Sequence, residues 1–286
     1  MKSYLYSLLM LTKPRIGLLV LLTGAAALVV QGSLSARPWL FVLVMAGLYA
    51  VSGSANALNQ YFEREVDAKM SRTRVKRPLP LGRLAPREAL LFAVLLGVAG
   101  VALFAILFNV LSAAIALFAV LFYGVFYTVW LKPNTHLNIV IGGAAGALAP
   151  VIAWAAASGG IDWPAVVMFL VIFFWSPPHF WALAMYLKGD YRAAGLPMLP
   201  LVKGDIATSR QILSYAVVTV CCSLLLLPAA YGFVYAVSSV VLGAMFIARA
   251  VGLKREQNPA AERGMFAYSI VYLCLLFAAI IVQAAV

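Results

Sequence analysis

The sequence predicts an all-α polytopic membrane protein, with about nine transmembrane helices in a bundle around a central cavity. Three observations predict this class. Of the 286 residues, 65% are hydrophobic and only 10% are charged, which is too little charge for the surface of a soluble globular protein. Apolar runs long enough to cross a bilayer recur along the chain. Nearly all Lys and Arg residues fall in alternate connections between those runs, as in the cytoplasmic loops of membrane proteins.

We expect one spanning helix for each apolar run of about 16 to 24 residues. The runs lie near 16–31, 38–59, 88–108, 110–131, 137–157, 163–186, 212–230, 232–252 and 266–285. Lys13, Pro14 and Arg15 interrupt the first apolar stretch, which favours a first membrane helix over a cleaved signal peptide. Residues 1–286 are therefore expected to form a single transmembrane domain.

The basic residues also predict the orientation in the membrane. With the amino terminus in the cytoplasm, the inner connections hold every Lys and Arg except Arg37. The carboxy terminus should then be external, and the polar segments at about 60–87 and 187–211 should be cytoplasmic loops. The same rule explains the formal net charge of +12. A basic inner face also attracts anionic lipid, so this charge does not indicate nucleic-acid binding.

Several segments carry no residue that we assign to chemistry. The hairpin of runs at 88–131 is apolar, and His136 just after it is expected to be solvated. The small residues at 142–146 either thin one helix face for a bulky flat ligand or pack tightly against another helix. The cysteines lie in apolar runs without metal-binding spacing, so we expect no disulfide; they are Cys221, Cys222 and Cys274.

A polar interruption between the second and third runs reads NALNQYFEREVDAKMSRTRVKRPLP. Within it, Asn59, Glu63 and Asp67 recur at i, i+4 and i+8, so a helix that continues through them projects all three from nearly one face. Arg72 and Arg77 follow closely. Carboxylates beside bases suit a magnesium diphosphate, because hard oxygens hold the cation while the bases neutralise phosphate oxygens. A charged cytoplasmic loop is the alternative interpretation.

The sixth run carries a second polar group, within WSPPHFWALAMYLKGDYRAAGLPMLP. Pro177 and Pro178 remove backbone donors and should kink or break the helix, opening it into a cavity. His179 follows them, and a histidine in an apolar span is costly unless it faces the bundle interior, so we expect a functional role. The inner end of this run carries Tyr186, Lys188, Asp190 and Arg192. We expect the two polar loops to face one site, with an interfacial patch as the alternative.

These motifs resemble those of the UbiA-type intramembrane prenyltransferases. Asn59, Glu63 and Asp67 with RTRVKRPLP after them are similar to the NxxxDxxxD and RTxxRPLP signatures of that family, with Glu63 where many relatives have Asp. PHFWALA, DYRAAGLPMLP and WLKxxTxxNIVIGGAAGA resemble the heme O synthases within it. The resemblance runs from KPRIG at Lys13 to the last helix. Relatives more often carry a further basic residue after Lys132, so the loop that follows it is left unassigned.

The resemblance implies a transfer of farnesyl from farnesyl diphosphate to the vinyl group of heme B, with water addition, giving heme O. It implies Mg²⁺ on Glu63 and Asp67, with Asn59 beside them. Asp190 or Tyr186 would orient the water, and His179 would contact the heme. The residues implied to neutralise the diphosphate are Arg72, Arg77, Lys188 and Arg192.

The expected location is the cytoplasmic side of a bacterial inner membrane, because no Arg- and Ser-rich transit segment precedes the first helix. A partnership with a heme A synthase or a terminal oxidase is left open. Two rival functions remain. The nearer is a prenyltransferase acting on another aromatic or quinone-precursor acceptor. The remote one is a transporter, which predicts ionisable residues near the bilayer midplane.

Overall fold

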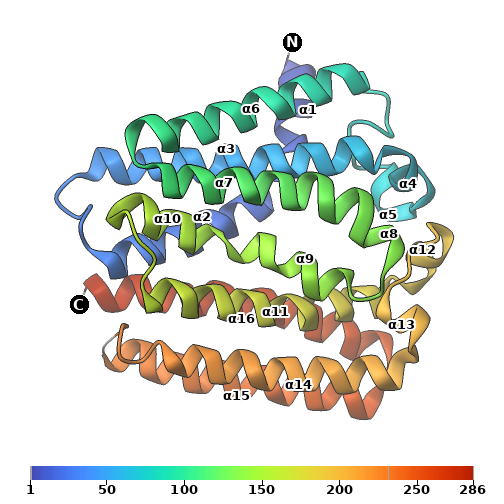
Figure 1. Ribbon diagram of the computed structural model, residues 1–286. Helices are drawn as coiled ribbons and strands as arrows, with labels where there is room; N and C mark the ends of the chain where they lie inside the picture. Colours follow the sequence, from blue (N-terminus) through green and yellow to red (C-terminus); the bar gives the residue numbers. More distant parts are fainter. Residues whose placement is uncertain (1, 231, 286) are drawn as a thin grey trace.

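The computed structural model describes residues 2–230 and 232–285, and the regular structure in these ranges is entirely helical (Figure 1). The elements are α1 (Lys2–Leu11), α2 (Pro14–Gln31), α3 (Pro38–Phe62), α4 (Arg64–Lys69), α5 (Ser71–Arg74), α6 (Pro86–Leu107), α7 (Val110–Leu121), the π-helix η1 (Phe122–Leu131), α8 (Lys132–Asn134), α9 (Asn138–Ala147), α10 (Ala149–Ser158), α11 (Trp163–Tyr186), α12 (Lys188–Ala193), α13 (Leu199–Val202), α14 (Gly204–Leu225), α15 (Phe233–Glu256) and α16 (Pro259–Ala285). Within the described residues, nine helical spans are long and apolar enough to cross a bilayer, as predicted.

Local chemistry explains where several of these helices begin and end. α2, α3, α6 and α16 each begin at a proline, whose fixed φ suits the first helical position and whose missing N–H is not needed there. α2 and α10 are followed directly by Gly32 and Gly159, with φ of 81° and 75°, a conformation that glycine adopts without steric cost. The short connections that result force consecutive helices to lie antiparallel.

Six elements form a closed ring of neighbours in the order α2, α3, η1, α9, α11, α16 and back to α2. α6 packs outside α3, and α14 and α15 pack outside α11 and α16. α10 contacts α2, α3, α7 and α11, so it occupies the half of the bundle away from α4 and α5 (Figure 1).

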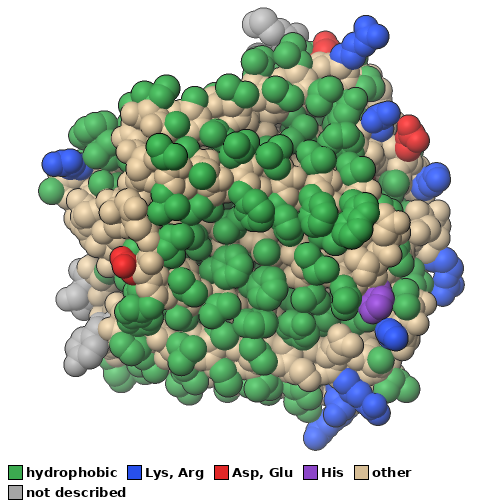
Figure 2. Space-filling view, in the orientation of Figure 1, with side chains coloured by type: hydrophobic (Ala, Val, Ile, Leu, Met, Phe, Trp, Pro, Cys, Tyr) green, Lys and Arg blue, Asp and Glu red, His purple; other side chains and the backbone are tan. Residues whose placement is uncertain are grey.

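The flank of the bundle is apolar, as a lipid-facing surface must be. Figure 2 shows hydrophobic side chains over the middle of one face, with basic side chains gathered toward one end. Large side chains such as Ile106 and Val110 are 79% and 78% exposed. Exposed apolar area on this scale is incompatible with water and normal in a bilayer. The chain is a multi-pass membrane protein.

The short elements of the polar loops gather at a single end of the bundle. α4, α5, α8, α12 and α13 lie together at the right of Figure 1, whereas the carboxy-terminal end of α16 lies at the opposite end. Cys221, Cys222 and Cys274 are free thiols in this structure.

Several helix boundaries differ from the prediction. α14 begins at Gly204 and α16 at Pro259, about two turns before the predicted apolar runs. The runs miss these first turns because the turns are polar and carry Asp205 and Glu262. α1 precedes the first predicted span and packs against α3 and α6. The span predicted near 137–157 divides into α9 and α10 at Leu148, since Pro150 cannot donate the backbone bond that would continue the helix.

The two prolines of the sixth span do not break it. α11 is one helix of 24 residues with Pro177 and Pro178 inside it, so the prolines do not break it, and the kink that was the other expected effect stays a prediction. α9, α14 and α16 all pack against α11. Support from neighbouring helices is one way in which proline-containing helices stay intact in membranes.

Candidate active site

Asn59, Glu63 and Asp67 lie one above another at the junction of α3 and α4. Glu63 separates the two helices, but the helical hydrogen bonds continue through it: Glu63 N donates to Asn59 O at 3.0 Å and Asp67 N to Glu63 O at 2.7 Å. Side chains four residues apart therefore share a face. All three residues are at most 5% exposed, so a pair of carboxylates is buried at the loop end of the bundle.

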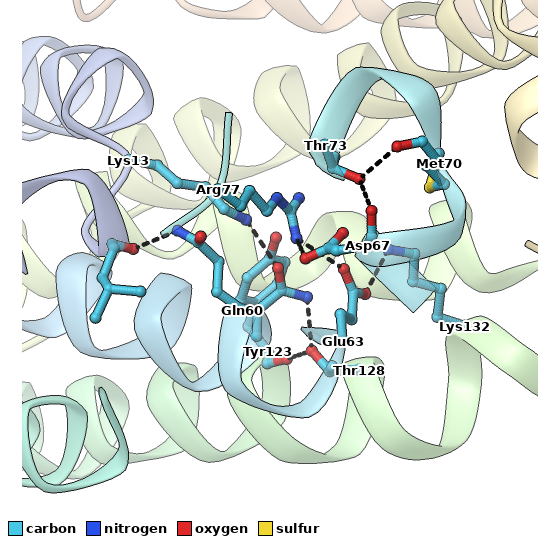
Figure 3. Close-up of polar contacts among 12 residues, drawn as sticks. Lys13, Gln60, Glu63, Asp67, Met70, Thr73, Arg77, Tyr123, Thr128 and Lys132 are labelled. Carbon is cyan, nitrogen blue, oxygen red and sulfur yellow. Dashed lines mark hydrogen bonds and ion pairs between the residues drawn. The ribbon is translucent and has the colours of Figure 1, made fainter. Parts of the chain in front are cut away.

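Three cations from three separate segments surround this pair (Figure 3). Arg77 Nη1 bonds Glu63 Oε2 at 3.4 Å and also bonds Asp67 Oδ2. Lys132 Nζ bonds Glu63 Oε1, and Lys13 Nζ donates to Asn59 Oδ1 at 2.8 Å. We call these five charged groups, Lys13, Glu63, Asp67, Arg77 and Lys132, the charge cluster.

Burial and charge shift the pKa values within the charge cluster in different directions. Burial alone would raise the pKa of Glu63, but Lys132, Arg77 and Lys13 lower it to about 2. Burial raises the pKa of Asp67, and Arg77 only partly offsets this. Burial, together with the repulsion of Arg77, lowers the pKa of Lys13. Glu63 is therefore the firmly ionised member of the acidic pair.

The π-helix η1 supplies the neutral wall of the site. Asn59 Nδ2 donates to Thr128 Oγ1 at 3.1 Å, and Thr128 Oγ1 donates to the carbonyl of Tyr123 at 2.7 Å, five residues earlier. π-Helical turns are rare and frequently occur at functional sites. The apolar hairpin, to which the sequence assigns no chemistry, thus brings Tyr123, Thr128 and, one residue past its end, Lys132 to the acids.

The backbone of Lys13 is held in an unusual conformation that directs its side chain into the cluster. Its φ is 52° and its ψ is 67°, which costs a residue with a Cβ roughly 1–2 kcal/mol. Such strain is typical of functional positions. From the sequence alone, Lys13 is not separable from an ordinary interfacial anchor.

A pocket of about 240 Å³ opens beside the charge cluster. Glu63, Thr128 and Lys132 form its polar side, and Phe62, Val66 and Leu196 contribute apolar surface. A polar end next to apolar walls suits an amphiphilic ligand whose charged group meets the cations.

The residues of the second polar loop do not join the charge cluster. Asp190 Oδ1 accepts from Ser71 Oγ at 2.6 Å and Oδ2 from the backbone N of Arg72 at 3.1 Å, so it ties α12 to α5. Burial alone would raise the pKa of Asp190, but the hydrogen bonds from Ser71 and Arg72 together lower it below its ordinary value. Lys188 pairs with Asp205 at 2.7 Å. The side chains of Arg72, Arg192 and Tyr186 are exposed.

His179 lies on α11, apart from the acids, and its ring packs between aromatic rings. Of the small residues on α9, Gly142 packs against Tyr127, where an added Cβ would come within 2.3 Å of the ring, and Gly143 packs against Ser176. Only Gly146 among these three glycines faces open space. Tight packing thus explains most of this stretch. His136 is half-buried in the loop before α9.

The acidic pair fits a magnesium ion that is shared with a diphosphate. Both carboxylates reach the same nitrogen of Arg77, so their oxygens face one point, and carboxylate oxygen is the ligand that Mg²⁺ prefers. The described residues contain no group of three or more acidic, His or Cys side chains that could hold a metal alone. Mg²⁺ is typically bound through one or two carboxylates plus substrate phosphates and water, and Glu63 and Asp67 supply the carboxylate part of that donor set.

A membrane bundle with two buried carboxylates beside a basic cluster defines the class as an intramembrane enzyme for anionic, amphiphilic substrates. The model of the UbiA prenyltransferase family matches residues 18–281. The chain belongs to the UbiA prenyltransferase family.

Curated relatives and solved structures agree with this membership. Relatives named protoheme IX farnesyltransferase, from Symbiobacterium thermophilum and Gloeobacter violaceus, are both 46% identical to this chain. The first alignment covers 96% of this chain and 92% of the relative, and the second covers 94% and 88%.

The solved structures share the fold at low identity. A digeranylgeranylglyceryl phosphate synthase has a TM-score of 0.80 at 21% identity, covering 99% of both chains. A UbiA homologue from Archaeoglobus fulgidus, solved bound to GPP and Mg²⁺, has a TM-score of 0.67 at 17% identity, covering 96% of this chain and 99% of that one.

Proposed function

We propose that this chain transfers a farnesyl group from farnesyl diphosphate to the vinyl group of heme B, with water addition, and so forms heme O. The observation that carries the proposal is the buried pair Glu63 and Asp67 within its three cations, in a chain that is 46% identical to relatives named protoheme IX farnesyltransferase. The pair supports the diphosphate donor, and the relatives support the acceptor.

Each group of the charge cluster has a role in the departure of the diphosphate. Glu63 and Asp67 would hold Mg²⁺, which supplies charge stabilisation for the leaving group. Arg77, Lys132 and Lys13 supply N–H donors for phosphate oxygens as negative charge grows on them. With both acids ionised, the five groups sum to a single positive charge, so an anion is attracted even before the metal is counted.

The apolar interior controls what happens to the allylic cation that remains. Lowering the water content around it limits premature capture, so the vinyl π electrons attack and place positive charge on the carbon next to the porphyrin. Water captures that carbon and loses a proton, leaving a hydroxyl. We assign Asp190 to holding the α5 loop over the site, because both of its oxygens already accept hydrogen bonds. Arg72, Arg192, Lys188 and Tyr186 remain candidates at the rim of the site, for steering anions or orienting water.

We place the site at the cytoplasmic face of a bacterial inner membrane. The reason is the positive-inside rule: with the amino terminus inside, only Arg37 among the Lys and Arg residues falls on the outer side. The transporter alternative lacks support, since the charge cluster lies at one end of the bundle rather than at mid-span.

The test uses the purified protein in lipid nanodiscs with farnesyl diphosphate, heme B and Mg²⁺, followed by mass spectrometry. The expected product is a porphyrin heavier than heme B by one farnesyl group and one hydroxyl. Prenylation of a phenol or quinone precursor with heme B left unchanged would support the nearer rival and refute the proposal. Loss of product on chelation of the metal is expected as well.

A further inference from the structure

His179 is held between aromatic rings at the contact of α11 with α16. Its imidazole stacks on Trp175, one turn earlier in α11, with ring centroids 4.5 Å apart and planes 16° apart. On the other side it stacks on Phe266 of α16 at 4.8 Å and 27°. The ring plane is therefore fixed, and only its edges are available for polar contacts.

Ser269 of α16 determines which nitrogen of His179 carries the proton. Ser269 Oγ donates its one hydrogen to the carbonyl of Phe266 at 2.6 Å. Its 2.7 Å contact with His179 Nδ1 must then be a bond in which Nδ1–H donates and Oγ accepts. Trp175 Nε1 donates to the carbonyl of the same Ser269 at 2.7 Å, so two bonds from α11 hold this serine in place.

The neutral His179 ring consequently presents Nε2 as a lone pair. Within the described residues, no hydrogen bond to Nε2 is found. Nε2 is also not one of the unpaired polar atoms that are fully enclosed by protein, so a ligand can reach it. His179 as a whole is 9% exposed. A free lone pair on an imidazole whose other nitrogen donates to an oxygen is the usual arrangement of a histidine that binds a metal.

We infer that His179 Nε2 is an axial ligand of the iron of the heme substrate, and that Ser269 is the positioning residue that sets its tautomer and ring plane. This inference rests on the proposed function, because heme is the acceptor there. The flanking edges of Trp175 and Phe266 give the flat porphyrin an apolar surface beside the ligand. Iron ligation would fix the position of the centre of the macrocycle relative to α11 and so limit how far its vinyl groups lie from the donor.

The experiment compares heme B with iron-free protoporphyrin IX, using protein in nanodiscs, Soret absorbance and electron paramagnetic resonance of the ferric complex. We expect His179→Ala to weaken heme binding at least about 10-fold and to remove the nitrogen-ligated signal, with imidazole in solution restoring it. Affinity for the iron-free porphyrin should stay within about twofold, since no iron bond is lost there.

The role of Ser269 is tested with two variants of Ser269 and with one control variant of Ser239. Ser269→Ala should weaken heme binding by about 10- to 100-fold and alter the spectrum, while Ser269→Thr restores both. Ser239→Ala is the control, because Ser239 is also fully buried and donates to the carbonyl three residues earlier but lies on α15. It should behave as the parent does. If His179→Ala does not fold, the comparison of Ser269→Ala with Ser269→Thr tests the inference in its place.

Three results would overturn the inference. An unchanged spectrum in His179→Ala removes the iron bond, and equal losses for heme and iron-free porphyrin reduce His179 to a packing residue. A shifted pH profile of turnover with an unchanged spectrum makes Nε2 a base instead. In each case the parent still forms the farnesylated porphyrin. Failure of the proposed function differs, because the parent itself then forms no such product.

Discussion

Replacement of Glu63 by Gln removes the charge on which the cluster depends while preserving the size of the side chain. The pKa of Glu63 is about 2, against an ordinary value of 4.5, because Lys132, Arg77 and Lys13 outweigh the effect of burial. One pKa unit corresponds to about 1.4 kcal/mol, so the ionised carboxylate contributes about 3 kcal/mol to folding. Loss of that contribution should lower the midpoint of thermal unfolding by several degrees.

The effect of pH follows from the direction of the shift. A folded-state pKa below the unfolded one gives stability that is complete above the unfolded pKa, about 4.5, and is lost as the pH falls toward about 2. The difference in unfolding midpoint between the parent and Glu63→Gln should therefore be full near neutral pH. It should shrink as the pH approaches about 3.

Thermal unfolding in detergent, with and without inorganic diphosphate, measures both consequences. Glu65→Gln is the matched control, since the side chain of Glu65 is 83% exposed and its pair with Arg64 is long, at 3.5 Å, a contact worth less than about 1 kcal/mol. Glu63→Gln also leaves more net positive charge in the cluster, so diphosphate without metal should stabilise it more than it stabilises the parent. Equal stability of Glu63→Gln and Glu65→Gln near neutral pH would refute the electrostatic account.

Three further outcomes are expected. Asp67→Asn should reduce farnesyl transfer at least about 100-fold by loss of a metal ligand, with insertion and folding retained; turnover at the parent rate would remove Asp67 from the metal site. Lys132→Ala should raise the KM for farnesyl diphosphate roughly tenfold, by loss of one charge-assisted bond. Lys203 is an exposed lysine that directly follows α13, and Lys203→Ala should leave this KM unchanged. Asp190→Asn should release α5, and hydrogen exchange should speed up at residues 71–77; protection equal to that of Asp162→Asn, a control at the other end of the bundle, would argue against the tether.

Spans, their number and the acidic motif are readable from the sequence because they depend on local patterns. Apolar runs predict helices wherever a bilayer is the solvent, and the i, i+4, i+8 spacing of Asn59, Glu63 and Asp67 predicts one shared face. The hydrogen bonds through Glu63 confirm that these three residues follow helical geometry.

The cations that contact Glu63 or Asn59 could not be predicted from the sequence, because Lys13 and Lys132 lie far from these residues along the chain. Lys132 approaches Glu63 only after a π-helical segment has changed the register of the fourth span, and nothing in its apolar residues signals that change. Lys13 looks like any interfacial lysine until its left-handed backbone is seen. The role of Ser269 depends on its hydroxyl donating to the carbonyl of Phe266 rather than to His179. No sequence pattern predicts that choice.

The π-helix η1 makes the length of the fourth span a functional quantity. A residue added to or removed from a helix rotates everything beyond it by about 100°. Shortening 122–131 by one residue toward an ordinary α-helix would therefore turn Lys132 away from Glu63 and Thr128 away from Asn59 together, although no residue of the charge cluster would have been altered. An insertion or deletion in this segment is therefore expected to be harmful even beside its exposed side chains, such as Val129 and Trp130, where a substitution would not disturb the site.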